Sequence, residues 1–254
     1  MKYLVFSFDD GRMDTFTKAL PILERFGYHC TINIITDFVL NPQKYLEISP
    51  PIPMSKEMIV EAQTNGHEVS CHGHKHTNTI EDVRTNIEFL KSFGLDEKEK
   101  LGFASPFSCL NDENCSDIYG LIESGELLYI RSGLQTRRES VLFKLLYIFQ
   151  LLTKSRYAFW RMYKKNIAKK NDERKLLYGV TITNRTTPNQ IKYFLKMMPE
   201  ESVAILILHS ISESKADCKS NKWCWYSGYL SELCEFLNAN MNISVITQRE
   251  VWGE

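Results

Sequence analysis

The sequence has no excess charge of either sign. Its 31 lysine and arginine residues balance 31 aspartate and glutamate residues. A neutral chain lacks the overall positive field that attracts nucleic acid, so we expect no nucleic-acid partner. Residues 1–10 also lack the longer apolar core and the small-residue cleavage site of a secretory signal. The sequence therefore predicts a cytoplasmic protein.

Cysteine and histidine are both scarce, but they are distributed differently. The seven cysteines are odd in number and have no secretory context, which favours free thiols over a disulfide framework. Cys218 and Cys224 match no metal-binding motif. Of the six histidines, four lie within ten residues, at positions 67, 72, 74 and 76. Such clustering makes this segment the first place to look for chemistry.

Apolar, strand-like segments alternate with helical patterns along most of the 254 residues. The predicted strands are 3–8, 30–35, 67–71, 101–104, 127–131, 176–182, 203–208 and 243–246, and the predicted helices are 14–26, 55–65, 80–93, 112–124, 188–196 and 226–238. About seven alternations predict one α/β domain over residues 1–254, with a parallel sheet that is open or closed into a barrel. Both architectures collect functional residues at the carboxyl ends of the strands.

Two adjacent carboxylates, Asp9 and Asp10, follow the first predicted strand. Carboxylates at the end of a buried strand are costly to ionise because desolvation and mutual repulsion both oppose the charge. A bound cation would offset that cost. The alternative is a helix N-cap or a turn, since Asp-Asp-Gly suits both.

His72 and His76 are four residues apart, so one helical turn would place both imidazoles on the same side. If the segment is extended instead, His74 joins them on one face. Two histidines with one carboxylate make a site with open positions for water and substrate. Such a site suits zinc, which is the ion we expect, while iron, cobalt and nickel remain alternatives.

These residues stand in motifs that resemble the polysaccharide deacetylases of the NodB-homology, carbohydrate esterase family 4 type. The matching segments are 7–11, 66–68 with His72 and His76, 105–107, 206–209 and 246–251, in the order of the family. The resemblance implies a distorted (β/α)7 barrel of the NodB type. It implies Asp9 as general base and Asp10, His72 and His76 as metal ligands. The backbone N–H of Phe107 would then be the oxyanion donor.

The implied roles agree with what these groups can do chemically. Asp9 can take the proton of the attacking water, and the metal and the Phe107 N–H can stabilise the tetrahedral oxyanion. His209, at the end of the strand 203–208, can protonate the leaving amine. A histidine in that position can also be purely structural.

The chain departs from the family pattern at Ala104, where the family commonly has an arginine two residues before the motif proline. Arg131 ends the next predicted strand. Our hypothesis is that Arg131 reaches across to replace the missing arginine beside Asp9. The alternative is a solvated arginine.

Residues 137–170 form an insertion that neither the alternation nor the family pattern requires. It holds ten lysines and arginines against the single acid Glu139, and residues 141–152 are mostly apolar. Twelve residues are too few to span a bilayer, which needs about 20. The insertion suits contact with an anionic membrane face, an acidic partner or a polyanionic glycan. The alternative is a helical flap packed over the barrel.

Together these features predict a metal-dependent hydrolase that removes an acetyl group from an N-acetylated, GlcNAc-like carbohydrate. Trp223 and Trp225, in the loop after His209, could stack on a sugar ring or could simply be packed. Two other functions stay open: hydrolysis of another non-peptide C–N bond, as in a formamide, cyclic imide or allantoin-like ring, and a non-catalytic sugar-binding role. The expected location is the cytoplasm, with the insertion as a peripheral contact at the inner membrane face.

Overall fold

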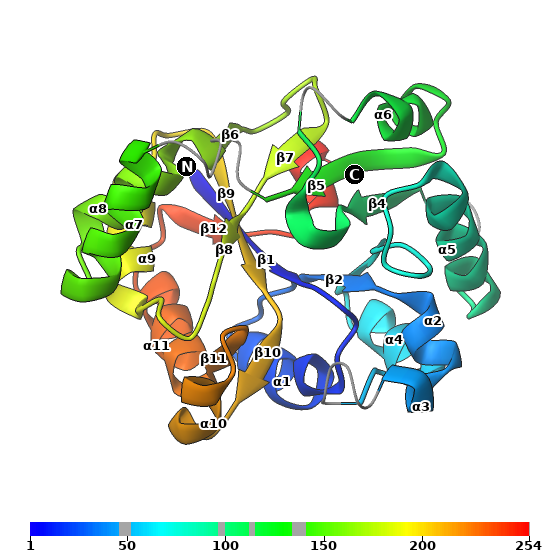
Figure 1. Cartoon of the computed structure of the whole chain (residues 1–254), viewed down its shortest axis with the longest axis horizontal. Helices are drawn as coiled ribbons and strands as arrows, with labels where there is room; N and C mark the ends of the chain where they lie inside the picture. The colour runs from blue at the N-terminus through cyan, green and yellow to red at the C-terminus, as the bar shows by residue number, and fades with distance from the viewer. Residues whose placement is uncertain (46–51, 96–99, 112–114, 134–140, 254) are drawn as a thin grey trace.

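The fold was analysed in a computed structural model, which describes residues 1–45, 52–95, 100–111, 115–133 and 141–253. The predicted positions Arg137, Arg138 and Glu139 of the insertion lie outside this part of the chain. Figure 1 shows a central, mostly parallel sheet that curves nearly into a barrel and is surrounded by helices.

The strands are β1 (Lys2–Phe8), β2 (Thr31–Ile34), β3 (Glu68–Cys71), β4 (Leu101–Ala104), β5 (Leu127–Ser132), β6 (Ala168–Lys169), β7 (Leu176–Tyr178), β8 (Val180–Thr181), β9 (Ser202–Leu208), β10 (Ser210–Ser212), β11 (Cys224–Tyr226) and β12 (Ile243–Val245). The main order is β6-β9-β1-β2-β3-β4-β5-β7. Because β7 pairs with β5 and β8 pairs with β9, Gly179 between them nearly closes the sheet. The distorted (β/α)7 barrel is confirmed.

The helices are α1 (Leu20–Glu24), α2 (Thr36–Leu40), α3 (Pro42–Tyr45), α4 (Lys56–Thr64), α5 (Ile80–Ser92), α6 (Ser116–Glu123), α7 (Val141–Thr153), α8 (Arg156–Tyr163), α9 (Pro188–Lys196), α10 (Lys215–Ser220) and α11 (Ser227–Asn238). Four short helices add to these: η1 (Thr15–Ala19), η2 (Pro106–Ser108), η3 (Lys164–Asn166) and η4 (Arg249–Trp252). Helix starts follow local chemistry. Thr187, for example, accepts the Gln190 N–H in a capping box before α9.

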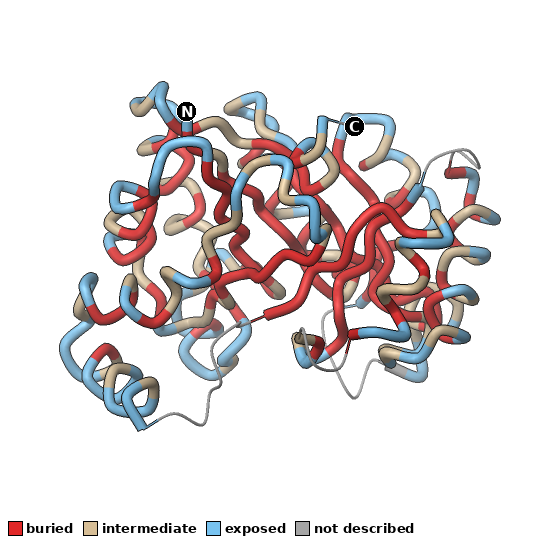
Figure 2. The backbone as a smooth tube through the Cα atoms, turned by 90° about the horizontal axis from the view of Figure 1, so that it is seen from above, coloured by how far each residue is buried: buried red, intermediate tan, exposed pale blue. Residues whose placement is uncertain are grey.

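The strands β1 and β9 are buried on both faces, as their continuous apolar sequences predict. Leu206 and Leu208 belong to the large core that includes the helices, whereas Ile205 and Ile207 belong to a second, smaller cluster. Figure 2 shows the central strands as buried and the outer faces of the helices as exposed. The carboxyl ends of β1 and β9 therefore follow strands that are almost completely buried.

The insertion adds two helices of different character. Helix α8 buries Ala158, Phe159 and Met162, and its Phe159 ring meets Phe194 of α9 edge to face at 6.1 Å. Helix α7 lies on α8 and buries only Gln150. No described helix is long and apolar enough to cross a membrane. The flap interpretation thus fits α8, while α7 remains largely uncovered.

Candidate metal centre and active site

Three potential metal ligands meet where β1 and β3 end. Asp10 follows β1, and His72 and His76 follow β3. One ligand atom from each of the three lies within 4.8 Å of the others. Asp10 and His76 have positive φ angles of 75° and 61°. The segment from His72 to His76 is therefore neither the helical turn nor the extended strand that the sequence allowed.

The orientation of His72 is fixed by its neighbours. Its Nδ1 lies 2.8 Å from the carbonyl oxygen of Ala104, so Nδ1 must carry the proton and donate it. Its backbone N–H donates to the side-chain oxygen of Asn86. The remaining Nε2 lies 3.6 Å from Asp10 Oδ1. A carbonyl partner on one ring nitrogen is the arrangement that metal-binding histidines show.

The electrostatics of the three residues suit a cation. Burial raises the pKa of Asp10, but hydrogen bonding to His72 and the nearby imidazoles outweigh it, so the net pKa is lowered. Burial, helped by the charge of His72, lowers the pKa of His76 to about 4. Burial would also lower the pKa of His72, but Asp9 and Asp10 raise it overall. An ionised carboxylate and a neutral His76 are the forms that bind a divalent metal.

His74, which the sequence left open as a ligand, lies outside this group. Its Nδ1 is 2.9 Å from Thr36 Oγ1, and its ring stacks on Phe89 with centroids 5.0 Å apart. Both contacts hold it on the side of α5. The described residues therefore offer a two-histidine, one-carboxylate site.

Asp9 is 2 % exposed and stands beside this site with one oxygen engaged. Its Oδ1 accepts hydrogen bonds from Asn33 Nδ2 at 2.8 Å and from Nη2 of Arg131. Its Oδ2 faces His72 Nε2 at 3.8 Å and His209 Nε2 at 3.9 Å. Asp9 thus has one oxygen held and one directed at the centre of the site.

Arg131 is fully buried in β5, and it is the register partner of Ala104 in β4. Its Nε and Nη1 have no hydrogen-bond partner among the described residues. A buried guanidinium without a counter-charge would be strongly unfavourable. The carboxylate of Asp9 supplies that counter-charge, so the solvated alternative does not describe this arginine.

His209 follows β9, and its Nε2 lies 3.9 Å from Asp9 Oδ2. The pKa of the His209 imidazole is lowered, and burial is the largest cause. Its Nδ1 has no partner among the described residues, and its ring lies 5.0 Å from that of Trp223. The backbone after it is fixed by Asp14, which accepts from the Ser210 hydroxyl and from the Ile211 N–H.

Phe107 has a positive φ of 56°, and its ring lies 4.5 Å from the ring of His76. Its side chain is 74 % exposed. The motif segment 105–107 therefore borders the candidate metal ligands. The positive φ places the Phe107 backbone in a conformation that non-glycine residues rarely adopt, as at many functional sites.

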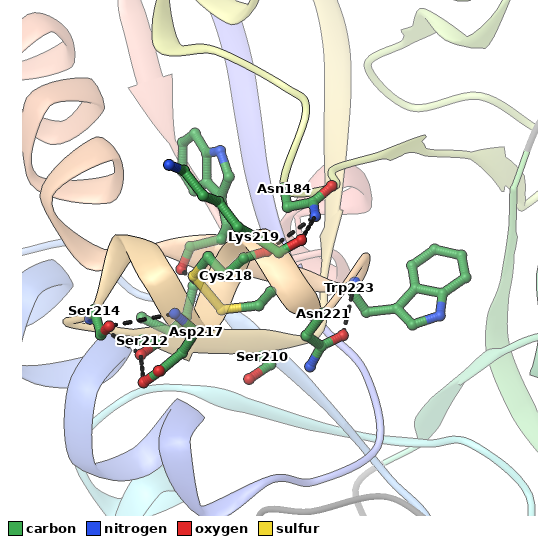
Figure 3. The surroundings of a disulfide bond; sticks show 12 residues. Asn184, Ser210, Ser212, Ser214, Asp217, Cys218, Lys219, Asn221 and Trp223 are labelled. Carbon is green, nitrogen blue, oxygen red and sulfur yellow. Dashed lines mark hydrogen bonds between the residues drawn. A yellow bond between two sulfur atoms is a disulfide. The ribbon is translucent and has the colours of Figure 1, made fainter.

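The two tryptophans after His209 have separate roles, and the loop expected for both holds only for Trp223, because Trp225 lies in β11. Trp225 is buried and donates to the Thr186 carbonyl, so it is a packing residue. Trp223 is 42 % exposed beside His209. Between them stands Cys224, which forms a disulfide with Cys218 (Figure 3). The expectation of free thiols is wrong for this pair and holds for Cys30, Cys71, Cys109, Cys115 and Cys234.

Sequence reasoning missed Asn33, Asn86 and Asp14. Asn33 binds Asp9, Asn86 holds the backbone of His72, and Asp14 connects the loop after β1 to that after β9. Asn33 could have been noticed, because it is a polar residue inside the apolar strand Thr31–Ile34. The other two lie in segments where polar residues are ordinary.

Comparison with known proteins identifies the relatives of this arrangement. A family model described as polysaccharide deacetylase matches residues 1–114. This segment contains Asp9, Asp10, His72, His76 and Phe107. The resemblance to the polysaccharide deacetylases is confirmed. The comparison with curated proteins finds no match.

Solved structures of carbohydrate esterase family 4 share the fold. A family 4 acetyl xylan esterase from Clostridium thermocellum, in complex with a cobalt ion, matches at 12% identity and a TM-score of 0.53, covering 98% of this chain and 90% of its own. The Bc1960 peptidoglycan N-acetylglucosamine deacetylase matches at 10% identity and a TM-score of 0.53, with 98% and 87% covered. The Xyl-CE4 domain of a xylanase from the hindgut metagenome of Trinervitermes trinervoides matches at 15% and 0.50, with 99% and 89% covered.

Proposed function

We propose that the protein is a metal-dependent hydrolase that removes the acetyl group from an N-acetylated, GlcNAc-like carbohydrate. The family match and the solved relatives support carbohydrate deacetylation. The observation that carries the finer proposal is the convergence of Asp10, His72 and His76 with the free oxygen of Asp9 and with His209.

Asp10, His72 and His76 would hold the divalent ion, and their donor set fits zinc first, with cobalt, nickel and iron as alternatives. A bound ion would polarise the acetyl carbonyl and make the attacking water more acidic. Asp9 Oδ2 would take the proton of that water, since Oδ1 is already engaged by Asn33 and Arg131.

The remaining steps use groups on the other sides of the site. The backbone N–H of Phe107 would donate to the oxygen that becomes negative as the water adds to the acetyl carbon. His209 Nε2 would take up the proton that Asp9 has removed from the water and pass it to the leaving nitrogen, which lets the amine depart. His209 lies 3.9 Å from Asp9, close enough for both to address one substrate.

Arg131 is proposed to replace the arginine that the family carries at the position of Ala104. Because the two residues are register partners on neighbouring strands, a side chain from either can approach Asp9. The guanidinium would hold Oδ1 of Asp9 and so keep its second oxygen oriented. Arg131 would therefore be a positioning residue.

We also propose that residues 1–254 act as one deacetylase-like domain, in which β12 near the C-terminus pairs with β1 at the N-terminus.

In this domain the insertion would contact an anionic membrane surface. Helix α7 exposes Val141, Leu142, Leu145, Ile148, Phe149 and Leu152. Residues 141–170 contain eight lysines and arginines and no acid, which is the composition of an interfacial helix pair. The cytoplasmic location stays a prediction.

Co-sedimentation with vesicles tests this contact. We expect binding to phosphatidylglycerol vesicles that weakens with salt and is lost in the double variant Leu145→Gln, Leu152→Gln. Met241→Gln is the matched control, because Met241 is 91 % exposed far from α7 in the sequence. Equal sedimentation of all three proteins would exclude the membrane contact and leave an acidic protein partner as the alternative.

The decisive experiment measures acetate release from chitooligosaccharides and other N-acetylated sugars by protein reloaded with zinc, cobalt or nickel. We expect metal-dependent release that falls about 10²–10⁴-fold in Asp9→Asn, the range of general base catalysis. Bound metal without acetate release would favour a formamide, cyclic imide or allantoin-like substrate. Absence of metal binding would favour a non-catalytic sugar-binding protein.

A further inference from the structure

A pocket of about 410 Å³ lies between the insertion and the loop that carries Trp223. Its walls are Phe143, Lys144, Tyr147 and Ile148 of α7, Tyr163 of α8, Thr181, Thr183, Lys222 and Trp223. The volume is within the range of small-molecule sites. None of the residues proposed for catalysis or metal binding belongs to this wall, so the pocket is separate from the metal centre.

Trp223 connects the pocket to the site of reaction. It lines the pocket, and its ring also lies 5.0 Å from that of His209. Figure 3 shows its side chain pointing away from the Cys218–Cys224 disulfide. A molecule whose sugar occupies the metal centre could therefore extend past Trp223 into the pocket.

The pocket wall combines apolar side chains with two cations. Phe143, Tyr147, Ile148 and Tyr163 offer apolar surface, whereas Lys144 and Lys222 bring two ammonium groups. Lys222 Nζ lies 4.5 Å from the Trp223 ring centroid. Neither lysine forms an ion pair with a described carboxylate. This wall suits a ligand that carries an anionic group next to a hydrocarbon segment.

We propose that the pocket holds the hydrocarbon tail of the substrate, and that the substrate is an amphiphilic sugar with a phosphate-like anion between sugar and tail. This inference rests on the proposed function. Helix α7 supports it with a separate observation, because this helix also exposes Leu142, Leu145 and Leu152, which do not line the pocket. Such a helix places the pocket where an amphiphilic substrate is found, at the surface of a lipid layer.

Binding of dodecyl phosphate and methyl phosphate, measured by calorimetry below the micellar concentration, tests the pocket without any reaction. We expect dodecyl phosphate to bind at least about tenfold more tightly, because each buried methylene group favours binding. Ile148→Trp should remove this preference by filling the pocket. Leu152→Trp is the matched control, since Leu152 is on α7, is 81 % exposed and does not line the pocket. If Ile148→Trp and Leu152→Trp prefer dodecyl phosphate over methyl phosphate to the same extent, the proposal is overturned.

The anionic part has its own variant. Lys144→Gln should weaken dodecyl phosphate binding about fivefold, because one charged contact is lost, and should leave dodecanol binding unchanged. An equal effect on both ligands would overturn the assignment of the anion to this wall. Lys144 is exposed, so we expect its replacement to leave folding unchanged. Circular dichroism checks that the variant is folded.

A second arm separates a substrate tail from a free lipid. The methyl and dodecyl phosphodiesters of N-acetylglucosamine 1-phosphate are compared as substrates without vesicles. We expect kcat/KM to be higher for the dodecyl compound in wild type and Leu152→Trp, and equal for the two compounds in Ile148→Trp. Pocket-dependent binding with no chain effect on kcat/KM would overturn the substrate assignment. Pocket-dependent binding with no deacetylation of either compound would instead contradict the proposed function.

Discussion

The strand ends of the barrel and the outer surface of α7 both reverse the usual distribution of residues, but in opposite directions. At the strand ends Asp9 and Arg131 are charged and almost fully buried. On α7, Leu145 and Leu152 are apolar and exposed. Asp9 and Arg131 pair with each other, whereas Leu145 and Leu152 leave most of their side-chain surface exposed. The Asp9–Arg131 pair is therefore compensated within the chain, and the outer surface of α7 is the region where we propose a contact with a membrane.

The largest effect should come from removing one of the three proposed metal ligands. His72→Ala should abolish metal-dependent acetate release and weaken metal binding by more than the roughly 10–100-fold that loss of a supporting residue costs. His74→Ala is the control from the same loop, because His74 contacts Thr36 and Phe89 instead. Metal content by mass spectrometry and release assays measure both. A similar loss in the two variants would mean that the loop, and not the ligand, was affected.

The next largest effect concerns the buried pair of the barrel. Arg131→Ala leaves the Asp9 carboxylate buried without its cation, which should cost about 3–5 kcal/mol of unfolding free energy. It should also lower kcat more than it raises KM, because the base is misplaced. Urea unfolding and steady-state kinetics measure the two effects.

The double variant Ala104→Arg, Arg131→Ala tests whether the cation can come from the neighbouring strand. Because the two positions are register partners, we expect part of the stability and activity to return. Ala104→Arg alone should be destabilising, since it adds a second buried cation next to Arg131. No recovery in the double variant would show that Arg131 acts only from β5.

A third prediction compares the packing of the two regions directly. Leu206→Ala in β9 should lower the unfolding free energy by about 2–5 kcal/mol, because Leu206 is fully buried in the core. Leu152→Ala on α7 should change it by less than about 0.5 kcal/mol. A large loss in Leu152→Ala would show that α7 is already covered, for example by a second copy of the chain.

The smallest effect is the pH dependence of metal binding. The carboxylates of Asp9 and Asp10 raise the pKa of His72 overall, so His72 keeps its proton to a higher pH than an ordinary histidine. Binding a metal must release that proton. Metal affinity should therefore fall by up to about tenfold per pH unit below the pKa of His72. His76, with a pKa of about 4, should add no dependence near neutral pH. Calorimetry in two buffers of different ionisation enthalpy counts the released protons.

The barrel could be predicted from the sequence because its strands are long apolar runs with clear ends. The predicted strand 203–208 corresponds to β9, Ser202–Leu208, and the predicted helix 188–196 coincides with α9. The two-residue strands β6 and β8 were missed or merged, since two residues carry no periodicity. Short helices such as α2 and α3 were missed for the same reason.

The site was predictable where it depends on strand ends, and less so where it depends on backbone turns. Parallel strands bring Asp9, His72 and His209 to one edge whatever the loops do. The selection of His76 over His74 depends on the positive φ of His76, which no pattern in the sequence indicates. The Cys218–Cys224 pair was missed because an odd cysteine count says nothing about one local bridge.

The pairing of Ala104 with Arg131 carries a wider lesson about how a sheet presents side chains. Two residues that are far apart in the sequence can place their side chains in the same volume when they are register partners on neighbouring strands. A chain read one position at a time shows a loss at 104 and an unrelated gain at 131. In space the carboxylate of Asp9 meets a guanidinium all the same. If Arg131 replaces the family arginine as we propose, a functional group has moved to another strand of this barrel while its position in space has stayed the same.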